Sequence, residues 1–403
     1  MKIALVHDYL KEYGGAERVL ESLHDIWPEA PVFTSFVDWE SLGPHRERLK
    51  KWDIHTTWAD NWFMRKFHSP LRFMAPWIWE SLDFRGFDVV ISSSGWYMSK
   101  GIITQPETMH LGYLHHPPRH LYGYATAVEW QKHLVVRVYA AVVNCYLRIY
   151  DYLSAQRVDY FIANSQETQK RIAKFYRRES TVIYPPVKTS PYSPPSQGGD
   201  RSGQKLPRET YFLCVSRLAR AKHIDLAIDA CQELGVTLKI VGKGRDEQNL
   251  KLKVKSPHFA KASGSTGWYL PSRGRQKSKV EFLGEVKDEE LGEIYHGARA
   301  LICPFEDEEF GIVAAEAMGH GVPVIAFNSG GLPEVIVNGK TGILFDELTV
   351  NSLLDALKKF DGLRDRTITA AACRQQAEKF SEEVFRKTMQ EYVGEKWREY
   401  TKT

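Results

Sequence analysis

Two acidic residues flank a Phe-Gly pair in the stretch EEFGIVAAEAMGHG, which begins at Glu308. Glu308 and Glu316 stand in a mostly apolar segment, where a carboxylate is costly to bury unless it has a partner. The preceding run ALICPF predicts a strand, and a helix should begin at Gly311 and stop at Gly321. Backbone amides at such a helix start suit an anion such as a phosphate.

The two carboxylates could bind hydroxyl groups. Glu316, in the second turn of the predicted helix, could accept hydrogen bonds from two adjacent hydroxyls, as a ribose presents. Glu308, on the loop, could reach a sugar further out. In the alternative interpretation, Glu316 caps or pairs locally and Glu308 faces solvent. The pattern alone leaves both interpretations open.

Other candidates also lie between a strand and a helix. The run VSRLARAK places Arg217 and Lys222 there, and two fixed cations would neutralise a diphosphate without a metal. Gly14 and Gly15 follow the first strand and permit close approach of the backbone to a ligand. His115 follows a strand and precedes a proline-stiffened turn. Taken singly, each could instead be structural.

The elements that must position these residues alternate along the chain. Apolar runs such as KIALVH, DVVISSS, YFLCVS and PVIAF predict strands, and amphipathic stretches between them predict helices, including a long one over 128–156. Continuous apolar strands between helices predict parallel sheets covered on both faces. We therefore expect an α/β protein with two Rossmann-like domains facing each other across a cleft, and ligands beyond the carboxyl ends of the strands.

Composition sets the expected boundaries. The domains should cover residues 1–187 and 210–380, joined by a Pro-, Gly- and Ser-rich linker over 188–209. Residues 251–280 carry eight Lys or Arg and no acid, which predicts a flexible insertion at about 251–279. This insertion is either a solvated loop or a contact with an anionic membrane or another anionic partner.

Several function classes are disfavoured. A net charge of +4 over 403 residues is too small to indicate nucleic acid, and the GxGxxG fingerprint of nicotinamide enzymes is absent. Five widely spaced cysteines without a CxxC pair favour a reducing, cytosolic compartment. The first residues read as a strand rather than a signal peptide. No apolar run of about 18 residues occurs, so we expect no membrane span.

Together the motifs resemble those of family 4 retaining glycosyltransferases of the GT-B fold. Glu308 and Glu316 match the E-x7-E motif of that family, SRLARAK its diphosphate loop, and GGAE its first glycine loop. The likeness covers nearly the whole chain, including FIANS, VIYPPV and NSGGLPEVIVNGKTGILF. The runs GGAERVLE, SAQRVDYFIANS and RRESTVIYPP are most similar to bacterial O-antigen mannosyltransferases.

The resemblance implies a role for each matching residue. Arg217 and Lys222 would hold the donor diphosphate, Glu316 the ribose and Glu308 the donor sugar, with His115 on the donor-sugar or acceptor side. Residues 280–284 would flank the base, with room provided by glycines. The further donor-binding positions are Gly15, Gly242, Gly244, Phe282, Phe310, Gly311, Ile312 and Val313. Residues 381–403 would form a last helix that returns to the first domain.

The implied activity is retaining transfer of a hexose, mannose from GDP-mannose, to a glycan or lipid-linked acceptor in surface polysaccharide biosynthesis. The alternatives are a UDP-sugar donor or a sugar-nucleotide epimerase of the same fold. No metal cofactor is expected, because no DxD-type pair is evident. The acceptor would bind the first domain, where NWFMRKFHSPLRFMAPWIWE serves either as core or as an amphipathic surface for a membrane-held acceptor. The expected location is the cytoplasm, peripheral to the inner face of the membrane.

Overall fold

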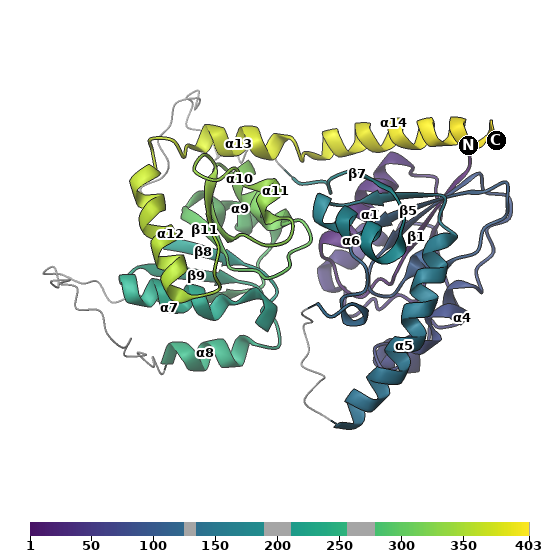
Figure 1. The fold of residues 1–403 in the computed structure, drawn as a ribbon, viewed down its shortest axis with the longest axis horizontal. Helices are drawn as coiled ribbons and strands as arrows, with labels where there is room; N and C mark the ends of the chain where they lie inside the picture. The colour runs from purple at the N-terminus through teal and green to yellow at the C-terminus, as the bar shows by residue number, and fades with distance from the viewer. Residues whose placement is uncertain (125–133, 189–210, 256–278, 403) are drawn as a thin grey trace, which may run out of the picture. The chain divides into compact units, whose positions relative to one another are not determined.

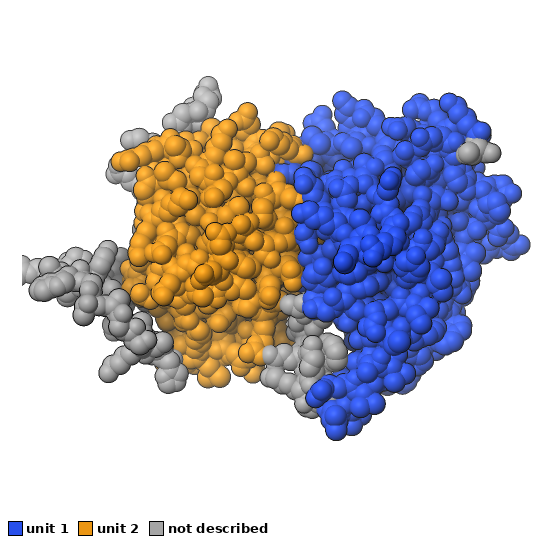
Figure 2. Space-filling model, in the orientation of Figure 1, with its two compact units in different colours: residues 1–186, 380–403 blue, residues 187–379 orange. Residues whose placement is uncertain are grey.

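The computed structural model describes residues 1–124, 134–188, 211–255 and 279–402. The chain forms two compact units, residues 1–186 with 380–403 and residues 187–379 (Figure 2). Each unit is built on a parallel β-sheet (Figure 1). The prediction of two Rossmann-like domains with parallel sheets is therefore confirmed.

The sheet of the first unit has seven strands in the order β3-β2-β1-β4-β5-β6-β7. Its strands are β1 (Ile3–His7), β2 (Val32–Thr34), β3 (Ile54–Thr56), β4 (Val89–Ser94), β5 (Met109–Leu114), β6 (Tyr160–Ala163) and β7 (Ser180–Val182). Its helices are α1 (Gly15–Ile26), α2 (Arg46–Leu49), α3 (Trp62–Phe67), α4 (Ala75–Trp79), α5 (Leu134–Gln156), α6 (Gln166–Tyr176) and α14 (Glu382–Tyr400).

Both faces of this sheet carry a core, as the fully apolar run of β1 requires. Successive strand residues point to opposite faces. Ile3 and Leu5 enter a cluster with α1 and α14, whereas Ala4 and Val6 enter a second cluster with α4 and α5. The C-terminal helix α14 thus belongs to the first unit, and its Arg386 donates a hydrogen bond to the backbone of α1.

The sheet of the second unit has six strands in the order β10-β9-β8-β11-β12-β13. Its strands are β8 (Tyr211–Val215), β9 (Thr237–Val241), β10 (Val280–Gly284), β11 (Ala298–Cys303), β12 (Val324–Phe327) and β13 (Gly342–Phe345). Its helices are α7 (Ile224–Leu234), α8 (Glu247–Lys255), α9 (Asp288–His296), α10 (Ile312–Gly319), α11 (Leu332–Val335), α12 (Val350–Leu363) and α13 (Ala370–Glu378).

Some expectations differ from the structure. The run LPEVIVNG predicts a helix over 332–339, but α11 ends at Val335, because Ile336 adopts an extended backbone. Residues 251–255, assigned to a flexible insertion, belong to helix α8. Most of that insertion, the linker from 189 onward and the start of the long helix before Leu134 lie outside the described residues.

A buried ion pair connects two parts of the first unit. Lys100 Nζ lies 2.5 Å from Asp151 Oδ1, and both side chains are at most 1% exposed. Tyr122 donates to the other carboxylate oxygen at 2.6 Å, and Ser154 accepts from Lys100 at 3.2 Å. Burial raises the pKa of the Tyr122 phenol, and the Asp151 charge raises it further, so the phenol stays a donor. The pair is therefore desolvated but hydrogen-bonded on both sides.

The predicted aromatic segment is divided between core and surface. Trp79 and Met64 are buried, whereas Trp62, Phe63 and Trp77 are each more than half exposed. Helix α5 adds an exposed apolar face, which we call the α5 stripe. It consists of Val135, Val138, Val142, Tyr146, Ile149 and Leu153. Their spacing places all six on one side of the helix. No helix among the described residues is long and apolar enough to cross a membrane.

Candidate functional site

The strand order of the second unit locates its ligand edge. From β8 the chain builds outward through β9 to β10, and β11 then returns to the other side of β8. Sheets of this kind bind ligands beyond the carboxyl ends of the strands, where the strand order reverses. Here that switch point lies between β8 and β11, whose following loops are 216–223 and 304–311. These loops carry Arg217, Lys222 and Glu308.

The two loops contact each other through both charge and backbone. Lys222 Nζ forms an ion pair with Glu308 Oε2, and the two side chains are 24% and 16% exposed. The ammonium group also lies 4.6 Å from the ring centroid of Phe305. The Glu306 N–H donates to the Ala221 carbonyl at 3.0 Å. Lys222 and Glu308, both predicted as site residues and 86 residues apart in the sequence, are thus in contact in a partly buried position.

A glycine pair from the loop after β12 supports the Glu308 loop. Gly331 N–H donates to the Glu308 carbonyl at 2.7 Å. Gly330 has φ of +61°, and a Cβ there would lie 2.0 Å from the same carbonyl oxygen. Asp307, also with positive φ, donates its N–H to Ser329 Oγ at 3.2 Å. The path of the loop is therefore fixed by backbone contacts that leave no room for a side chain.

Helix α10 begins directly after this loop. Gly311 has φ of +99°, and a Cβ there would lie 2.7 Å from Leu332 Cδ2. Ile312 and Val313 are partly buried and supply first-turn N–H groups, for which an α-helix itself has no acceptors. Glu316 lies in the second turn and is 7% exposed. Glu308 and Glu316 thus occupy different environments, a loop and a buried helix position.

Two glycines after β9 have a structural explanation. A Cβ on Gly242 would lie 1.9 Å from the Ser216 carbonyl oxygen, and one on Gly244 would lie 2.1 Å from the Leu218 carbonyl oxygen. The room that these glycines create is therefore filled by the backbone of the Arg217 loop. Room for a base, the role expected for them, is not needed to explain their presence.

A hollow of about 490 Å³ opens after β9, at the carboxyl edge of the second sheet. Its lining consists of Gly244, Arg245, Glu247, Gln248 and Lys251. The Lys251 ammonium lies 5.5 Å from the ring centroid of Phe282, which is half-buried in β10. Of the other predicted positions, Arg217 is exposed on its loop and the Phe310 side chain is buried.

The switch point of the first unit lies between β1 and β4. Asp8, directly after β1, accepts hydrogen bonds from the N–H groups of Gly95, Tyr97 and Ser99 at 2.9–3.0 Å. This carboxylate therefore shapes the turn after β4. Gly15 is exposed as the first residue of α1.

A buried chain of polar side chains crosses the same switch point. His115 Nε2 lies 2.8 Å from Ser93 Oγ, which lies 3.1 Å from His7 Nδ1. His7 Nε2 lies 3.4 Å from Glu17 Oε1, and Glu17 Oε2 accepts from the Gly14 N–H at 2.8 Å. Sequence reasoning found His115 but missed its three partners. The polar endings of two apolar strands, KIALVH and DVVISSS, were the available signal.

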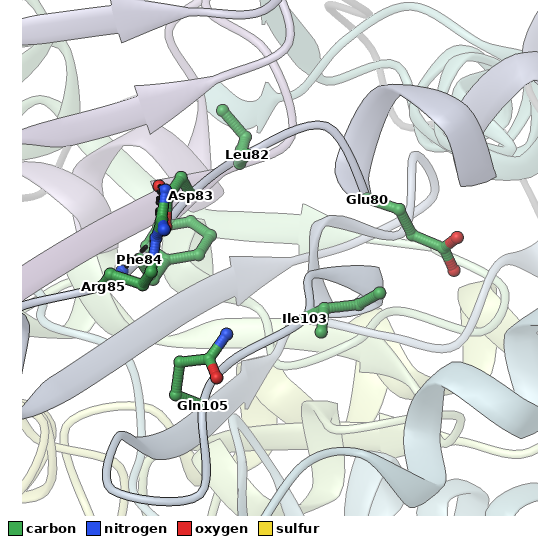
Figure 3. A pocket seen from close by; sticks show the side chains of 7 residues that line it. All are labelled: Glu80, Leu82, Asp83, Phe84, Arg85, Ile103 and Gln105. Carbon is green, nitrogen blue, oxygen red and sulfur yellow. Dashed lines mark hydrogen bonds and ion pairs between the residues drawn. The ribbon is translucent and has the colours of Figure 1, made fainter.

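A second hollow, of about 300 Å³, lies in the first unit (Figure 3). It is at the amino ends of the strands, whereas the switch point is at their carboxyl ends. Its lining consists of Glu80, Leu82, Asp83, Phe84, Arg85, Ile103 and Gln105. These residues precede β4 and β5 rather than follow them, and Asp83 and Arg85 hydrogen-bond to each other at 2.8 Å. Because α/β sheets bind ligands beyond their carboxyl ends, this hollow is not the candidate site.

Thiols and metal ligands do not form a further site in the part of the chain that the structure describes. All five cysteines are free, and all but Cys145 are buried. Burial raises the pKa of the Cys231 thiol to about 12, which disfavours the reactive thiolate. No group of three or more His, Cys, Asp or Glu among the described residues could hold a metal ion.

Comparison with known proteins finds a match to the part of the chain that holds the loops after β8 and β11. Residues 209–360 match the family model described as "Glycosyl transferases group 1". D-inositol 3-phosphate glycosyltransferase of Nocardioides sp. is 29% identical over 254 residues, which are 59% of this chain and 54% of that protein. Alpha-1,3/1,6-mannosyltransferase ALG2 of Dictyostelium discoideum is 27% identical over 248 residues, which are 56% of this chain and 57% of that protein. The chain thus spans about half the length of the curated relatives it matches.

Solved structures share the whole fold. Anabaena Alr3699/HepE, in complex with UDP and glucose, superposes with a TM-score of 0.68 at 19% identity, over 98% of this chain and 99% of that one. Sucrose-phosphate synthase from Thermosynechococcus elongatus superposes with a TM-score of 0.71 at 17% identity, over 99% of this chain and 100% of that one. The chain therefore has the GT-B fold of these structures, and its residues 209–360, which hold the Lys222–Glu308 pair, match the glycosyl transferases group 1.

Proposed function

We propose that this protein is a glycosyltransferase that takes a hexose from a nucleoside-diphosphate sugar and retains its anomeric configuration. The observation that carries the proposal is the Lys222–Glu308 pair at the switch point between β8 and β11, immediately before the start of α10. A cation, a carboxylate and helix-start amides at one edge suit a ligand with both phosphates and hydroxyls.

The cations and amides would act on the leaving group. Departure of a nucleoside diphosphate builds negative charge on its phosphates, which Lys222, Arg217 and the first-turn amides of α10 would stabilise. Lys222 already has an anionic partner in Glu308. An arriving phosphate would compete with Glu308 for the ammonium group, and so free the carboxylate for the sugar.

The carboxylates and His115 would bind hydroxyls. Glu316, buried in α10, suits the ribose, and Glu308, on the partly exposed loop, suits the transferred sugar, where positive character develops. His115 would contact the donor sugar or the acceptor. We propose front-face attack. The acceptor oxygen bonds to the anomeric carbon as the bond to the leaving phosphate breaks, and that phosphate accepts the hydroxyl proton. The turnover we propose needs no divalent metal and survives excess EDTA.

The proposed donor is GDP-mannose. Similarity to the O-antigen mannosyltransferases and to the mannosyltransferase ALG2 supports mannose. A UDP-sugar is the second candidate, because solved structures of the same fold are described with UDP and UDP-glucose. A sugar-nucleotide epimerase is the third. The proposed setting is the synthesis of surface polysaccharide in the cytoplasm.

The proposed acceptor is a glycan or a lipid-linked one, reached by contact with the inner face of the membrane. The α5 stripe together with Trp62, Phe63 and Trp77 presents apolar and aromatic surface, and Lys66 on α3 adds charge beside the Trp62 ring. Such surfaces bind anionic bilayers peripherally. Co-sedimentation should show binding to vesicles with anionic lipid at low salt, and Val138→Asp with Val142→Asp should reduce it. Equal binding by this double variant would exclude the α5 stripe.

A binding and product experiment tests the function as a whole. Thermal stability should rise with one nucleotide sugar of a GDP- and UDP-sugar panel, because a ligand that binds only the folded state stabilises it. Lys222→Ala should lose this shift. Lys253→Ala, which removes an ion pair with Asp229 elsewhere in the same unit, should keep it. Proton NMR of the product then reports the anomeric configuration, and inversion would refute the retaining mechanism.

A further inference from the structure

We propose that Glu17, His7 and Ser93 fix the ring hydrogen of His115 on Nε2, so that Nδ1 becomes the hydrogen-bond acceptor of that ring. All four side chains are at most 8% exposed. This inference rests on the proposed function, in which His115 contacts a sugar hydroxyl. It adds three positioning residues that act through His115 and touch no substrate themselves.

Glu17 lies at one end of this series of side chains, and its carboxylate sets the direction of every hydrogen bond in the series. An ionised Glu17 can only accept, so the hydrogen of His7 lies on Nε2, which faces Glu17 Oε1 at 3.4 Å. A neutral His7 then has an unprotonated Nδ1, which accepts the Ser93 hydroxyl hydrogen at 3.1 Å. The Ser93 oxygen in turn accepts from His115 Nε2–H at 2.8 Å. In a neutral His115 ring, the remaining nitrogen, Nδ1, then carries no hydrogen.

The geometry favours this direction over the reverse one. If His7 were charged, both of its nitrogens would donate, Ser93 would donate to His115 Nε2, and His115 would carry its hydrogen on Nδ1. Hydrogen bonds between ionised nitrogen and carboxylate span about 2.7–2.9 Å. The His7–Glu17 separation of 3.4 Å is longer, and His7 is 2% exposed, where a charge is costly. The two directions predict opposite tautomers, which can be measured.

The tautomer decides the direction of the hydrogen bond that the ring can make with a hydroxyl group, which can donate or accept. With the hydrogen on Nε2 committed to Ser93, a neutral His115 ring would accept a hydrogen bond from a hydroxyl group of the hexose. With the opposite tautomer it would offer a donor instead. A hydrogen-bond partner that holds an imidazole in one tautomer commonly fixes its ring orientation as well.

The protein contains a matched control, Ser92, which lies one residue away from Ser93. Ser92 Oγ lies 2.8 Å from His110 Nε2, and both side chains are fully buried. Ser92 and Ser93 are neighbours in β4 and point to opposite faces of the sheet. Ser92→Ala therefore removes the same kind of Ser–His bond at the same depth, but leaves His115 untouched. Any general effect of cutting a buried serine should appear in both variants.

The experiment measures nitrogen-15 shifts of the imidazole rings in the full-length protein, with histidine labelled and the His115 signals assigned from a His115→Asn sample. We expect the shift of an unprotonated nitrogen at Nδ1 and of a protonated one at Nε2. Ser93→Ala should move both shifts toward a tautomer mixture, and Ser92→Ala should not. A protonated Nδ1 in the unmutated protein overturns the proposal, as do His115 shifts that Ser93→Ala leaves in place. The spectrum of the unmutated protein decides the tautomer even if Ser93→Ala does not fold.

Kinetics give an independent readout. Ser93→Ala should lower kcat by about 10-fold, the scale of one hydrogen bond, with little change in the donor KM, and Ser93→Thr should restore part of it. Ser92→Ala should keep kcat. Equal kcat for Ser93→Ala and the unmutated protein would overturn the positioning role. Absence of any nucleotide-sugar binding would instead refute the proposed function, while the nitrogen shifts would still report the tautomer.

Discussion

Each unit contains a lysine–carboxylate pair, and the two differ in what surrounds them. Lys100–Asp151 in the first unit is at most 1% exposed, and a phenol and a hydroxyl complete its hydrogen bonds. Lys222–Glu308 in the second unit is 24% and 16% exposed and lies at a strand-order switch point. The first pair is shielded from solvent, and its polar atoms have hydrogen-bond partners. In the function that we propose, the second would exchange its partner for a ligand.

We use this difference to predict which charged pair supports folding and which supports the proposed function. A buried pair is weak evidence for net stability, but removal of one partner leaves an uncompensated charge in the interior. A pair with access to solvent contributes little to folding, yet its charges remain available. Substitutions at the first pair should therefore affect unfolding, and substitutions at the second should affect turnover.

The largest effect should follow Asp151→Asn, which strands the Lys100 ammonium inside the first unit. The free energy of unfolding of that unit should fall by about 3–5 kcal/mol. Ten of the 11 tryptophans belong to the first unit, so denaturant unfolding followed by tryptophan fluorescence reports on it. Asp83→Asn, which breaks the exposed pair with Arg85, should leave the curve unchanged. Equal curves for all three proteins would contradict the distinction.

Lys222→Ala should produce the next largest effect, on catalysis rather than folding. Loss of a fixed cation at the leaving group should cost about 2–4 kcal/mol of transition-state stabilisation, measured as kcat/KM. The unfolding free energy should change by less than about 1 kcal/mol. Lys253→Ala should match the unmutated protein in both measurements. Near-normal turnover by Lys222→Ala would remove the diphosphate assignment.

Glu308→Gln and Glu316→Gln sharpen the comparison within the second unit. In its proposed place beside the transferred sugar, Glu308 would lie where positive charge develops in the transition state, so Glu308→Gln should lower kcat by about 10²-fold. In its proposed place beside the ribose, Glu316 would make similar contacts in ground and transition states, so Glu316→Gln should mainly raise the donor KM. Steady-state kinetics with donor varied separates the two. If the pattern is exchanged between the variants, the two roles are reversed.

The smallest predicted effect concerns pH and again involves the buried lysine. Burial and, to a smaller extent, the nearby Lys100 charge lower the pKa of His110 to about 3. Its pKa in the unfolded chain is about 6.5, so the unfolded state binds more protons and stability falls as pH drops below that value. His110 should contribute a loss of about 1 kcal/mol between pH 6.5 and 5.5. Denaturant unfolding of His110→Gln should show a shallower pH dependence, and an unchanged slope would contradict this.

The sequence predicted the fold better than the edges of the sheets. Largely apolar runs such as those of β1, β8 and β11 identified buried parallel strands, because both of their faces are covered. Strand β3 escaped prediction because it pairs at one edge of the first sheet and is partly or fully exposed. It therefore carries no apolar run. The helix predicted over 332–339 is longer than α11, because the apolar pattern continues after the backbone leaves the helix.

Site residues were predictable where a motif sits on one loop, and not where the site is assembled from several strands. Lys222 and Glu308 each follow a strand, and both were singled out. Their mutual contact depends on β8 and β11 being neighbours, which local pattern does not encode. The partners of His115 come from β1, α1 and β4, so only the sheet order brings them together.

The glycine pair at 330 and 331 has a consequence for which sequence changes this protein can tolerate. The obstacle to a side chain at Gly330 is a carbonyl oxygen, which cannot rotate away, so a saturation library at this position should be almost uniformly inactive. Shape changes in the Glu308 loop are thus closed to single substitutions. In the function that we propose, a new donor preference would therefore come from side chains that face the ligand, because the backbone of this loop cannot change its course.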